Sequence, residues 1–395
     1  MKDVPPTRIR FLAELRNGFP FASGTFTNEP LTPLIRIRDI KSTSFNTFVP
    51  RWAIPDEAIA KDGDIIIGMD GDFNSILWTR GEAAINQRVA SLRPTKGTDS
   101  RFIAYAIPRK LKEINDITHS TTVKHISGEQ ILNIQVPHYD LPTQRRIADY
   151  LDRETAQIDA MTEALDGLVA RLEERRVETV DQYIFPKGTR IGNLGYAVEN
   201  VDQGISPGPA QGKPGKFKVL KSGCVNGGFF HDEEVKPVDS SLGDLSNLLV
   251  ADGDLIVSRA SGSARFVGAA GIVAEPSPGT ILSDKTYRLN LLPEHSRRFM
   301  AKCLNSRSVR AQIERRISGA SGLAKNIGLS SVLSLKVPLP PLVEQRRIAD
   351  HLDAETAKID AMIAKAGELR ALLEERRSAL ITATVTGQHP VPEEP

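Results

Sequence analysis

Two stretches of this chain, residues 136–180 and 337–381, are near copies of each other. They align without a gap at a constant offset of 201 residues (337 minus 136), and 25 of the 45 aligned positions are identical. Such an internal repeat constrains the fold more strongly than composition does. Its period is far too long for a solenoid of small repeats. Each copy is therefore expected to belong to a duplicated unit made of a domain and a helix.

The repeated stretch has the apolar spacing of a coiled-coil seam, with steps of seven, three and four residues. The seam positions are Leu151, Ile158, Met161, Leu165, Leu168 and Leu172, matched by Leu352, Ile359, Met362, Ala366, Leu369 and Leu373. Proline precedes each helix and a Gly/Pro pair follows it. Each helix should contain roughly 36–40 residues and extend about 55–60 Å. We expect the two to pair antiparallel; packing of each on its own domain, or homodimerisation through the seam, are the alternatives.

The segments before each repeat read as mixed α/β domains on one plan. In residues 1–135 we expect a strand at Leu34–Ile40, a turn at Asp62–Asp64 followed by a buried strand, another strand at Ala84–Leu92, and a helix at Ser100–Lys112. Residues 188–336 repeat this outline, with Asp252-Gly253-Asp254 before a strand, a helical region at Arg297–Ile317, and Lys325 matching Lys124 at the same 201-residue offset.

The predicted class is α+β, with two mixed α/β domains, each followed by a long helix. The segments are 1–135, 136–187, 188–336 and 337–387, and the tail 388–395 is expected to be disordered. Between the shared elements the copies differ in length and chemistry, most clearly at residues 68–85 and 258–282. Two domains thus share a scaffold while their loops do not.

Charge is distributed unevenly along the chain, although the net charge is only +2. Counted from the sequence, residues 1–135 carry +3 and residues 188–336 carry +6, whereas residues 136–187 carry −4 and residues 337–395 carry −3. Basic globules and acidic helices suggest that different parts meet different partners.

Several protein classes find no support in the composition. No apolar run approaches the ~18–20 residues that span a bilayer, and the first residues lack the apolar core of a signal peptide. The only cysteines are Cys224 and Cys303, so neither a disulfide framework nor a zinc cluster is expected. The predicted compartment is the cytoplasm, with no membrane partner.

Catalytic motifs are scarce. The chain has no G-x-x-x-x-G-K-[ST] loop, no H-x-x-x-H or H-E-x-x-H pair, and no Asn/Asp-Pro-Pro-aromatic tetrad for amino methylation. Glu234-Val235-Lys236 matches a three-residue fragment found in some nucleases, but so short a match arises by chance. These absences together favour a binding protein with no catalytic residues and no bound metal.

The combination resembles the specificity subunits of type I restriction–modification systems. The motif Leu-x-x-Gln-Arg-Arg-Ile-Ala opens both helices, at Leu141 and Leu342, and the resemblance covers nearly the whole chain. Further matches are Asn17–Phe21, Asp62–Ile65 with Asp252–Leu255, and Asn86–Val89. The second domain departs from the last motif, with Ser283-Asp284-Lys285-Thr286, so strand-end structure is the alternative to a recognition role for Asn86–Arg88.

The resemblance implies that each globule is a target recognition domain for one half of a bipartite, asymmetric sequence in double-stranded DNA. The helices would fix the spacer between the half-sites and dock two adenine methyltransferase subunits; two ATP-driven restriction subunits would complete the complex. S-adenosylmethionine, ATP and Mg²⁺ would belong to those partners. The predicted helix length, about 1.5 turns of B-DNA, fits two half-sites on one face of the duplex.

Arginine and asparagine in the divergent loops are the candidates for base contacts, because both can bond bases bidentately. The candidates are Asn74, Arg80, Arg259 and Arg265, with Ser261 and Ser263 as lesser ones. Candidates for phosphate contacts are Arg36, Arg38, Lys41, Lys124, Lys218, Lys221 and Lys325. A solvated surface side chain is the alternative for each of them.

Exact duplication on the helices predicts docking surfaces for two identical subunits. The residues are Gln144, Arg145, Arg146, Glu173 and Arg176, with their copies Gln345, Arg346, Arg347, Glu374 and Arg377. Charge pairing along one exposed helix face is the simpler alternative for the Glu/Arg clusters.

Two other functions stay open. One is an interaction scaffold whose coiled coil gathers proteins without sequence-specific DNA binding. The other is a nuclease or methyltransferase acting alone. DNA binding with sequence preference would exclude the first, and inactivity of the isolated chain with S-adenosylmethionine or Mg²⁺ would exclude the second.

Overall fold

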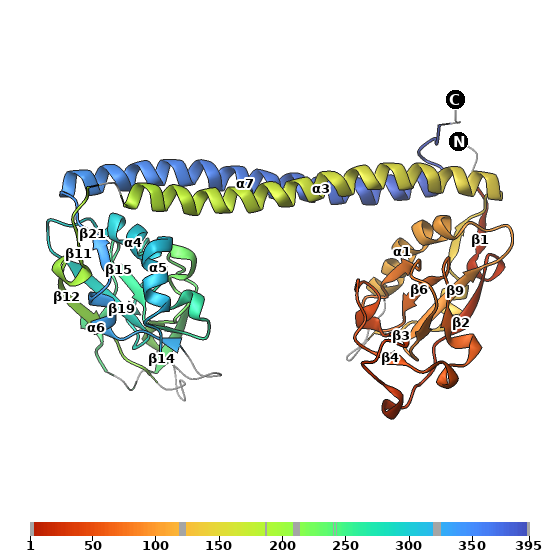
Figure 1. Ribbon diagram of the computed structural model, residues 1–395, viewed down its shortest axis with the longest axis horizontal. Coiled ribbons are helices and arrows are strands. Elements are labelled where there is room, and N and C mark those ends of the chain that lie inside the picture. Colours follow the sequence, from red (N-terminus) through yellow and green to blue (C-terminus); the bar gives the residue numbers. More distant parts are fainter. Residues whose placement is uncertain are drawn as a thin grey trace. The chain divides into compact units, whose positions relative to one another are not determined.

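A computed structural model describes residues 4–117, 124–185, 188–207, 214–239, 241, 243–318 and 325–392. The chain divides into two compact units: residues 1–165 with 368–395, and residues 166–367. Two helices of 44 residues, α3 (Leu141–Ile184) and α7 (Leu342–Val385), run through both units. Figure 1 shows the two helices side by side within each unit.

The first unit has one four-stranded antiparallel sheet that packs against α1 (Ser100–Ile117). In the order β2-β9-β6-β7, its strands are Ala13–Asn17, Val89–Pro94, Ile65–Gly68 and Ser75–Leu77. Isoleucine side chains of β6 alternate between two cores: Ile65 and Ile67 face α1, and Ile66 faces the second sheet. A strand buried on both faces explains the unbroken apolar run.

The second sheet of the first unit has the order β4-β3-β8-β5 and a core of its own. Its strands are Phe48–Val49, Thr32–Ile35, Ala83–Ile85 and Ile59–Ala60, with β3 parallel to β8. The short pair β1 (Pro6–Arg8) and β10 (Gln135–Pro137), with α2 (Gly128–Leu132) before β10, leads into α3.

The second unit repeats the strand order of the main sheet, while its second sheet has three described strands instead of four. Its main sheet, β12-β19-β15-β17, comprises Val198–Gln203, Thr286–Leu291, Leu255–Ser258 and Ala270–Ile272. Its second sheet, β14-β13-β18, comprises Val235–Asp239, Pro214–Leu220 and Thr280–Ile281, again with a parallel pair, β13 and β18. The remaining strands are β11 (Ile191–Asn193), β16 (Ala260–Ser261), β20 (Lys325–Asn326) and β21 (Lys336–Pro338).

The helices of the two units differ at one point. In the first unit α1 is continuous, whereas in the second the chain breaks at Ser306 into α4 (Arg297–Asn305) and α5 (Arg307–Glu314). Ser306 has extended backbone angles and caps α5 by accepting from the Val309 N–H. The short α6 (Leu329–Leu333) precedes β21.

Within each unit α3 and α7 pair antiparallel, as predicted. In the first unit Asp159 of α3 pairs with Arg377 of α7, and in the second Arg176 pairs with Asp360. In the first unit Tyr139, just before α3, also bonds the Val385 carbonyl, and in the second Tyr183 of α3 lies against His351 of α7. Within each unit higher numbers on one helix meet lower numbers on the other, so the direction is opposite. The expected α+β class with paired long helices is confirmed, and the helices are longer than the predicted 36–40 residues.

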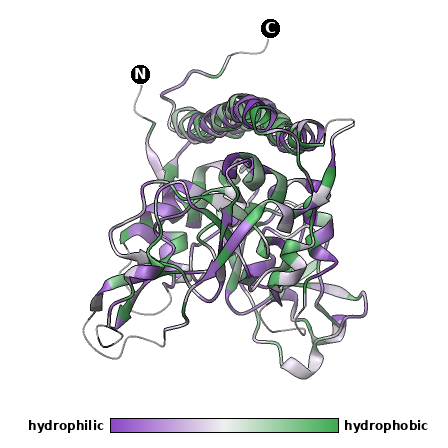
Figure 2. Cartoon of the chain, turned by 90° about the vertical axis from the view of Figure 1, so that its left-hand side faces the viewer, coloured by the Kyte–Doolittle hydropathy of each residue, from purple (hydrophilic) through white to green (hydrophobic). Residues whose placement is uncertain are grey.

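The seam is buried less evenly than the heptad pattern predicts. Leu151, Ile158 and Leu172 are buried, as are their copies, but Met161 and Leu168 are 49% and 45% exposed, and their copies Met362 and Leu369 are 45% and 47% exposed. Hydrophobic and hydrophilic residues intermingle along both helices (Figure 2). Each unit therefore leaves apolar side chains of the seam open to solvent.

Three expectations of local structure are corrected. The predicted strand at 34–40 ends at Ile35, and a 3-10 helix covers Ile37–Asp39, closed by the Arg36–Asp39 ion pair. The predicted strand at 84–92 is two strands, β8 and β9, separated by a turn. The described part of the tail, residues 388–392, packs on the first unit: His389 bonds the Tyr150 hydroxyl and Val391 packs on the first core.

Candidate nucleic-acid interface

The paired Asp-Gly-Asp motifs belong to the scaffold. Asp64 and Asp254 are buried and accept hydrogen bonds from main-chain N–H groups three residues earlier, at Lys61 and Ala251. Each also pairs with an arginine of the central strand, Arg93 in β9 or Arg288 in β19. The hydrogen bond to Asp64 raises the pKa of Arg93 above its usual value. A buried carboxylate that has both a main-chain N–H and an arginine as partners explains the motif without any contact to DNA.

The Asn-Gly-Phe-Pro motif marks a close approach of two chain segments. A Cβ at Gly18 would lie 1.9 Å from the Asn86 carbonyl oxygen, and one at Gly204 would lie 1.9 Å from that of Leu282, so only glycine fits at either place. Asn86 also accepts from the Val89 N–H, as Ser283 does from Thr286. The Asn86 turn and its counterpart are therefore the same strand-end structure in both units.

Ionic contacts join each globule to its long helix at equivalent places. Arg101 of α1 donates to Asp149 and Asp152 of α3 at 2.6 and 2.9 Å. Arg298 of α4 bonds Asp350 and Asp353 of α7 in the same way. Burial alone would lower the pKa of Arg101, but these carboxylates raise it above its ordinary value. Part of the negative charge of each long helix therefore pairs with an arginine of its own globule.

One surface hollow of the first unit brings together two of the predicted DNA contacts. Lys41 and Asn74 line a cavity of about 380 Å³ with Lys112 and Asn115 from α1. Asp72 and Asp116 line it too, so two carboxylates offset the two ammonium groups. Asn74 follows Phe73, whose φ of 47° turns the β6–β7 connection sharply. Lys112 was missed from the sequence, where only its place on the polar face of a helix could have indicated it. Amides and ammonium groups gathered at one surface can bond base edges and phosphates.

Arg80 serves the fold of the first unit. Its guanidinium donates to the Ser42 carbonyl and lies 4.9 Å from the Trp78 ring centroid and 5.7 Å from that of Phe45. This arrangement orders the loop that carries the predicted phosphate contacts. Of those, Arg38 has a 73% exposed side chain and Lys41 is exposed.

Lys124 and Lys325 take equivalent places in the two units. The Lys124 ammonium donates to the Asn115 carbonyl at 2.6 Å, and its own carbonyl accepts from the Gly71 N–H after β6. Lys325 in β20 pairs in register with Ser261 in β16, after β15. Both lysines therefore lie beside the loop that diverges most between the units.

The divergent loop of the second unit is held by an arginine that sequence reasoning missed. Arg310 of α5 donates to the Val267 and Arg265 carbonyls at 2.6 and 2.9 Å. Arg265 is itself exposed and lies over Phe266, and Ser263 is exposed beside it. Arg259 donates to the Asp284 carbonyl at 3.2 Å and is half-buried. Arg265 is thus presented outward, whereas Arg259 is used within the domain.

The remaining lysines lie on or next to β13. Lys218 is exposed on the strand, and Lys221 lies 3.7 Å from Glu234. Glu234 belongs to the Glu-x-Lys fragment. The lysine of that fragment, Lys236, donates from its ammonium group to the Pro207 carbonyl. Among the described residues, no three His, Cys, Asp or Glu side chains gather to hold a metal ion.

The predicted docking role of Gln144 and Gln345 is wrong, because both side chains are buried. Gln144 accepts from the Asp99 N–H at the start of α1 and donates to the Tyr139 carbonyl. Gln345 makes the same two bonds, to the Ser296 N–H and the Pro340 carbonyl. The invariant glutamine of the repeat therefore fastens each globule to its helix.

The other docking candidates differ in accessibility. Arg145, Arg146 and Arg346 are exposed, and Arg347 is exposed and forms a bidentate pair with Glu344. Glu173 and Glu374 are exposed as well. Arg176 and Arg377 differ from the predicted docking role, because the guanidinium of each forms an ion pair with an aspartate of the opposite helix.

Two globules on one plan, each joined to a long paired helix, define a duplicated two-domain architecture, and similarity to known proteins agrees. Residues 1–168 and 209–369 match the family described as "Type I restriction modification DNA specificity domain". This match covers most of the chain. The chain belongs to that family.

Named relatives are specificity subunits of type I restriction enzymes. The EcoBI subunit of Escherichia coli is 36% identical over 173 residues, covering 42% of this chain and 35% of that protein. The EcoKI subunit of Escherichia coli K12 is 22% identical over 389 residues, covering 92% of this chain and 83% of that protein. The chain thus spans about a third of the first relative and most of the second.

Solved structures show the same fold. A chain from a study of assembly and conformational transition of the type I R-M system superposes with a TM-score of 0.74 at 15% identity, covering 98% of both chains. The HsdS subunit from Thermoanaerobacter tengcongensis gives 0.55 at 15% identity, covering 98% of this chain and 97% of that one. None of the described helices is long and apolar enough to cross a membrane.

Proposed function

We propose that each globule binds one half of a bipartite, asymmetric DNA target. The observation that carries this is the contrast between the two units: the main sheets share one strand order, while the loops after β6 and β15 differ in length and in the groups they present. Lys41 and Asn74 line the first surface, and Arg265 and Ser263 lie exposed on the second. Different groups on one scaffold suit two different half-sites.

The paired helices would set the spacer between the half-sites. Each has 44 residues and so a length of about 66 Å, close to two turns of B-DNA. Their acidic charge disfavours binding along the phosphate backbone. A spacer set by protein geometry would be independent of the bases within it.

The same helices would dock two methyltransferase subunits. Equivalent apolar side chains, Met161 with Leu369 in the first unit and Met362 with Leu168 in the second, are each nearly half exposed. Exposed arginines of the repeat, Arg145 and Arg346, accompany them. Two equivalent sets of exposed groups suit two copies of one partner.

Chemistry would belong to the partners. The chain would act as a non-catalytic specificity subunit, in the cytoplasm, with adenine methylation performed by the methyltransferase subunits and cleavage by two restriction subunits. S-adenosylmethionine, ATP and Mg²⁺ would bind there. The fragment around Glu234 does not argue otherwise, since its lysine bonds a main-chain carbonyl.

Selection from a random duplex library, using the chain co-expressed with its methyltransferase, tests the proposal. Two short motifs separated by a spacer of fixed length and random sequence are expected. Replacing residues 68–85 by the corresponding loop of another recognition domain should change one motif and leave the other intact. Binding without any sequence preference in the assembled complex would instead identify a protein scaffold.

A further inference from the structure

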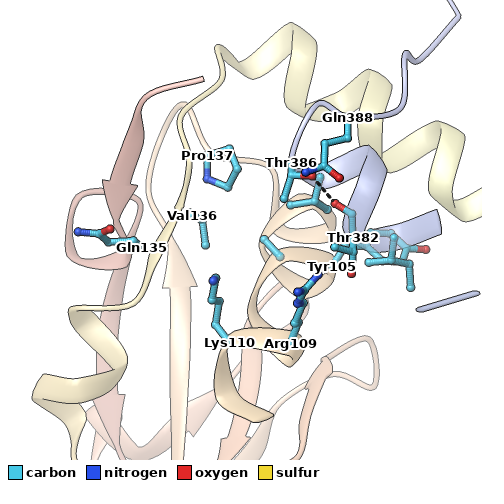
Figure 3. Close-up of a pocket in the computed structure, with 12 residues that line it drawn as sticks. Tyr105, Arg109, Lys110, Gln135, Val136, Pro137, Thr382, Thr386 and Gln388 are labelled. Atoms are coloured by element: carbon cyan, nitrogen blue, oxygen red, sulfur yellow. Dashed lines mark hydrogen bonds between the residues drawn. The ribbon is translucent and has the colours of Figure 1, made fainter. Parts of the chain in front are cut away.

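The first unit contains an open cavity for which the second unit supplies an internal comparison. It has a volume of about 290 Å³ and lies between α1, β10 and the end of α7. Figure 3 shows Tyr105, Arg109 and Lys110 from α1 on one side, Gln135 to Pro137 on another, and Thr382 and Thr386 on the third. Its floor is apolar, with Val136 and Val385 both buried.

The edge of β10 offers main-chain hydrogen-bonding groups to this cavity. In the antiparallel β1–β10 pair, Ile9 bonds Ile134 and His138 bonds Pro5, so the bonded pairs alternate through Thr7 and Val136. Gln135 opposite Arg8 is a non-bonded pair, and its N–H and C=O point away from β1. Within the described residues nothing bonds the Gln135 main chain from the other side.

In the second unit the same edge is covered by α5. Lys336 of β21 is the counterpart of Gln135, opposite Asn193. The Gln312 carboxamide of α5 bonds it twice, accepting from the Lys336 N–H at 2.9 Å and donating to its carbonyl at 2.9 Å. Val309 and Ile313 of α5 are fully buried against a core that includes Val337 and Ile184.

The helix break at Ser306 explains why only one unit is covered. Beyond that break α5 starts anew, and the Asp181 carboxylate of α3 accepts from the Arg307 N–H at its first turn. In the first unit α1 continues without a break, and Asn115 near its end bonds the Gly71 carbonyl. The end of α1 is therefore directed away from β10, and no described residue covers the edge as α5 does in the second unit.

We propose that this cavity binds a helical segment of a partner polypeptide that presents a glutamine to the Gln135 main chain. The segment would place aliphatic side chains on Val136, Ile381 and Val385, as Val309 and Ile313 do in the second unit. This contact goes beyond the proposed function, because it is made once per chain, whereas docking on the duplicated helices is made twice. It gives the two ends of a duplicated protein different partners.

The probe is a fluorescein-labelled peptide of residues 304–317 of this chain, held helical by a lactam bridge between positions 311 and 315. Position 311 lies in α5 and position 315 is its C-cap, and both are exposed. Fluorescence anisotropy with the full chain should show saturable binding below about 1 mM. A peptide carrying Gln312→Ala should bind at least about tenfold more weakly, because two hydrogen bonds are lost. A peptide carrying Glu314→Ala, at an exposed position of α5 outside these contacts and outside the lactam bridge, serves as the matched control and should bind unchanged.

Thr382→Trp in the full chain fills the cavity and should abolish peptide binding while leaving the thermal unfolding midpoint within a few degrees. A benzoylphenylalanine at peptide position 309 should crosslink to residues 105–110, 135–137 or 381–388, even if Thr382→Trp alters folding. Absence of saturable binding, or crosslinks confined to residues 166–367, would overturn the proposal. So would a tenfold gain in affinity on deleting residues 388–395, since the tail would then be the occupant.

Discussion

The Arg176 guanidinium of α3 donates to the Asp360 carboxylate of α7 at 2.9 Å. The same pair recurs with the helices exchanged, because Asp159 and Arg377 lie 201 residues before Asp360 and after Arg176. A duplicated residue here meets the copy of its own partner. The Glu-Glu-Arg-Arg motif therefore helps to specify direction and register of the helix pair, in addition to any docking role of its glutamates.

Reversing this charge pair should show its contribution. Arg176→Asp should lower the free energy of unfolding by about 0.5–1 kcal/mol, since both groups are partly exposed. Asp360→Arg in the same chain should restore most of that loss. Urea denaturation measures both, and Glu173→Ala, at an exposed neighbouring position, is the matched control. An additive double variant would show that the pair contributes nothing to register.

Gln345→Leu should destabilise the second unit by about 1–3 kcal/mol. The change removes the acceptor of the Ser296 N–H and the donor to the Pro340 carbonyl in a buried place. Arg346→Ala, next to it and exposed, should leave the unfolding midpoint unchanged. Calorimetry distinguishes the two. Full stability of Gln345→Leu would contradict the role of this glutamine in fastening the globule to α7.

Large-scale organisation was predictable from the sequence, because duplication and heptad spacing are visible in it. The antiparallel pairing followed from one seam occurring twice in one chain. The seam's exposed positions did not follow, since heptad spacing fixes which side a residue such as Met161 faces but not how closely the partner approaches there.

The roles of individual site residues were less predictable. Gln144 is a polar residue next to two arginines in the sequence, which suggests an exposed position. Its hydrogen bonds to Asp99 and Tyr139 depend on how α1 packs against α3. The sequence around Arg80 does not indicate that its guanidinium contacts the rings of Trp78 and Phe45. Lys112 and Asn74, far apart in sequence, share a hollow only because of the β6–β7 turn. Such tertiary contacts leave no local pattern.

Arg80→Ala should affect protein stability, and Arg38→Ala should affect DNA binding. Loss of the Arg80 side chain should destabilise the first unit by about 1–3 kcal/mol, because a main-chain carbonyl and two aromatic faces lose their partner. Arg38, with its 73% exposed side chain, should leave stability unchanged and weaken DNA binding of every sequence. Thermal unfolding and titration with duplex DNA separate the two. A stable Arg80→Ala protein with one altered half-site would assign Arg80 to base contact instead.

Substitutions of Asn74 and Lys41 should affect DNA binding in different ways, although both residues line one hollow. Asn74→Ala should relax base preference in a single half-site, with about 1–3 kcal/mol of discrimination lost. Lys41→Ala should weaken binding about equally for all sequences and reduce the slope of log affinity against log salt by about one. Competition binding at several salt concentrations measures both. Altered preference in both half-sites would contradict assignment of one globule to one half.

Acid should loosen the joint between α4 and α7. Burial raises the pKa of Asp353, but its bonds to Lys302 and Arg298 outweigh this and hold the pKa below the usual 3.8. A lowered pKa stabilises the folded state above pH ~4, and this stabilisation is lost as pH falls through the lowered value. Unfolding followed from pH 7 to pH 2 should show a shallower decline for Asp353→Asn. An identical decline would exclude this carboxylate as a contributor.

The spacer length of the bound DNA tests the central claim most directly. Seven residues inserted after Leu165 in α3 and seven after Ala366 in α7 would keep the heptad phase and lengthen the pair by about 10 Å, or roughly three base pairs at ~3.4 Å each. Selection of bound duplexes with the assembled complex should recover both original half-sites with a spacer longer by about three. Recovery of the original spacer, or altered half-site sequences, would contradict the account.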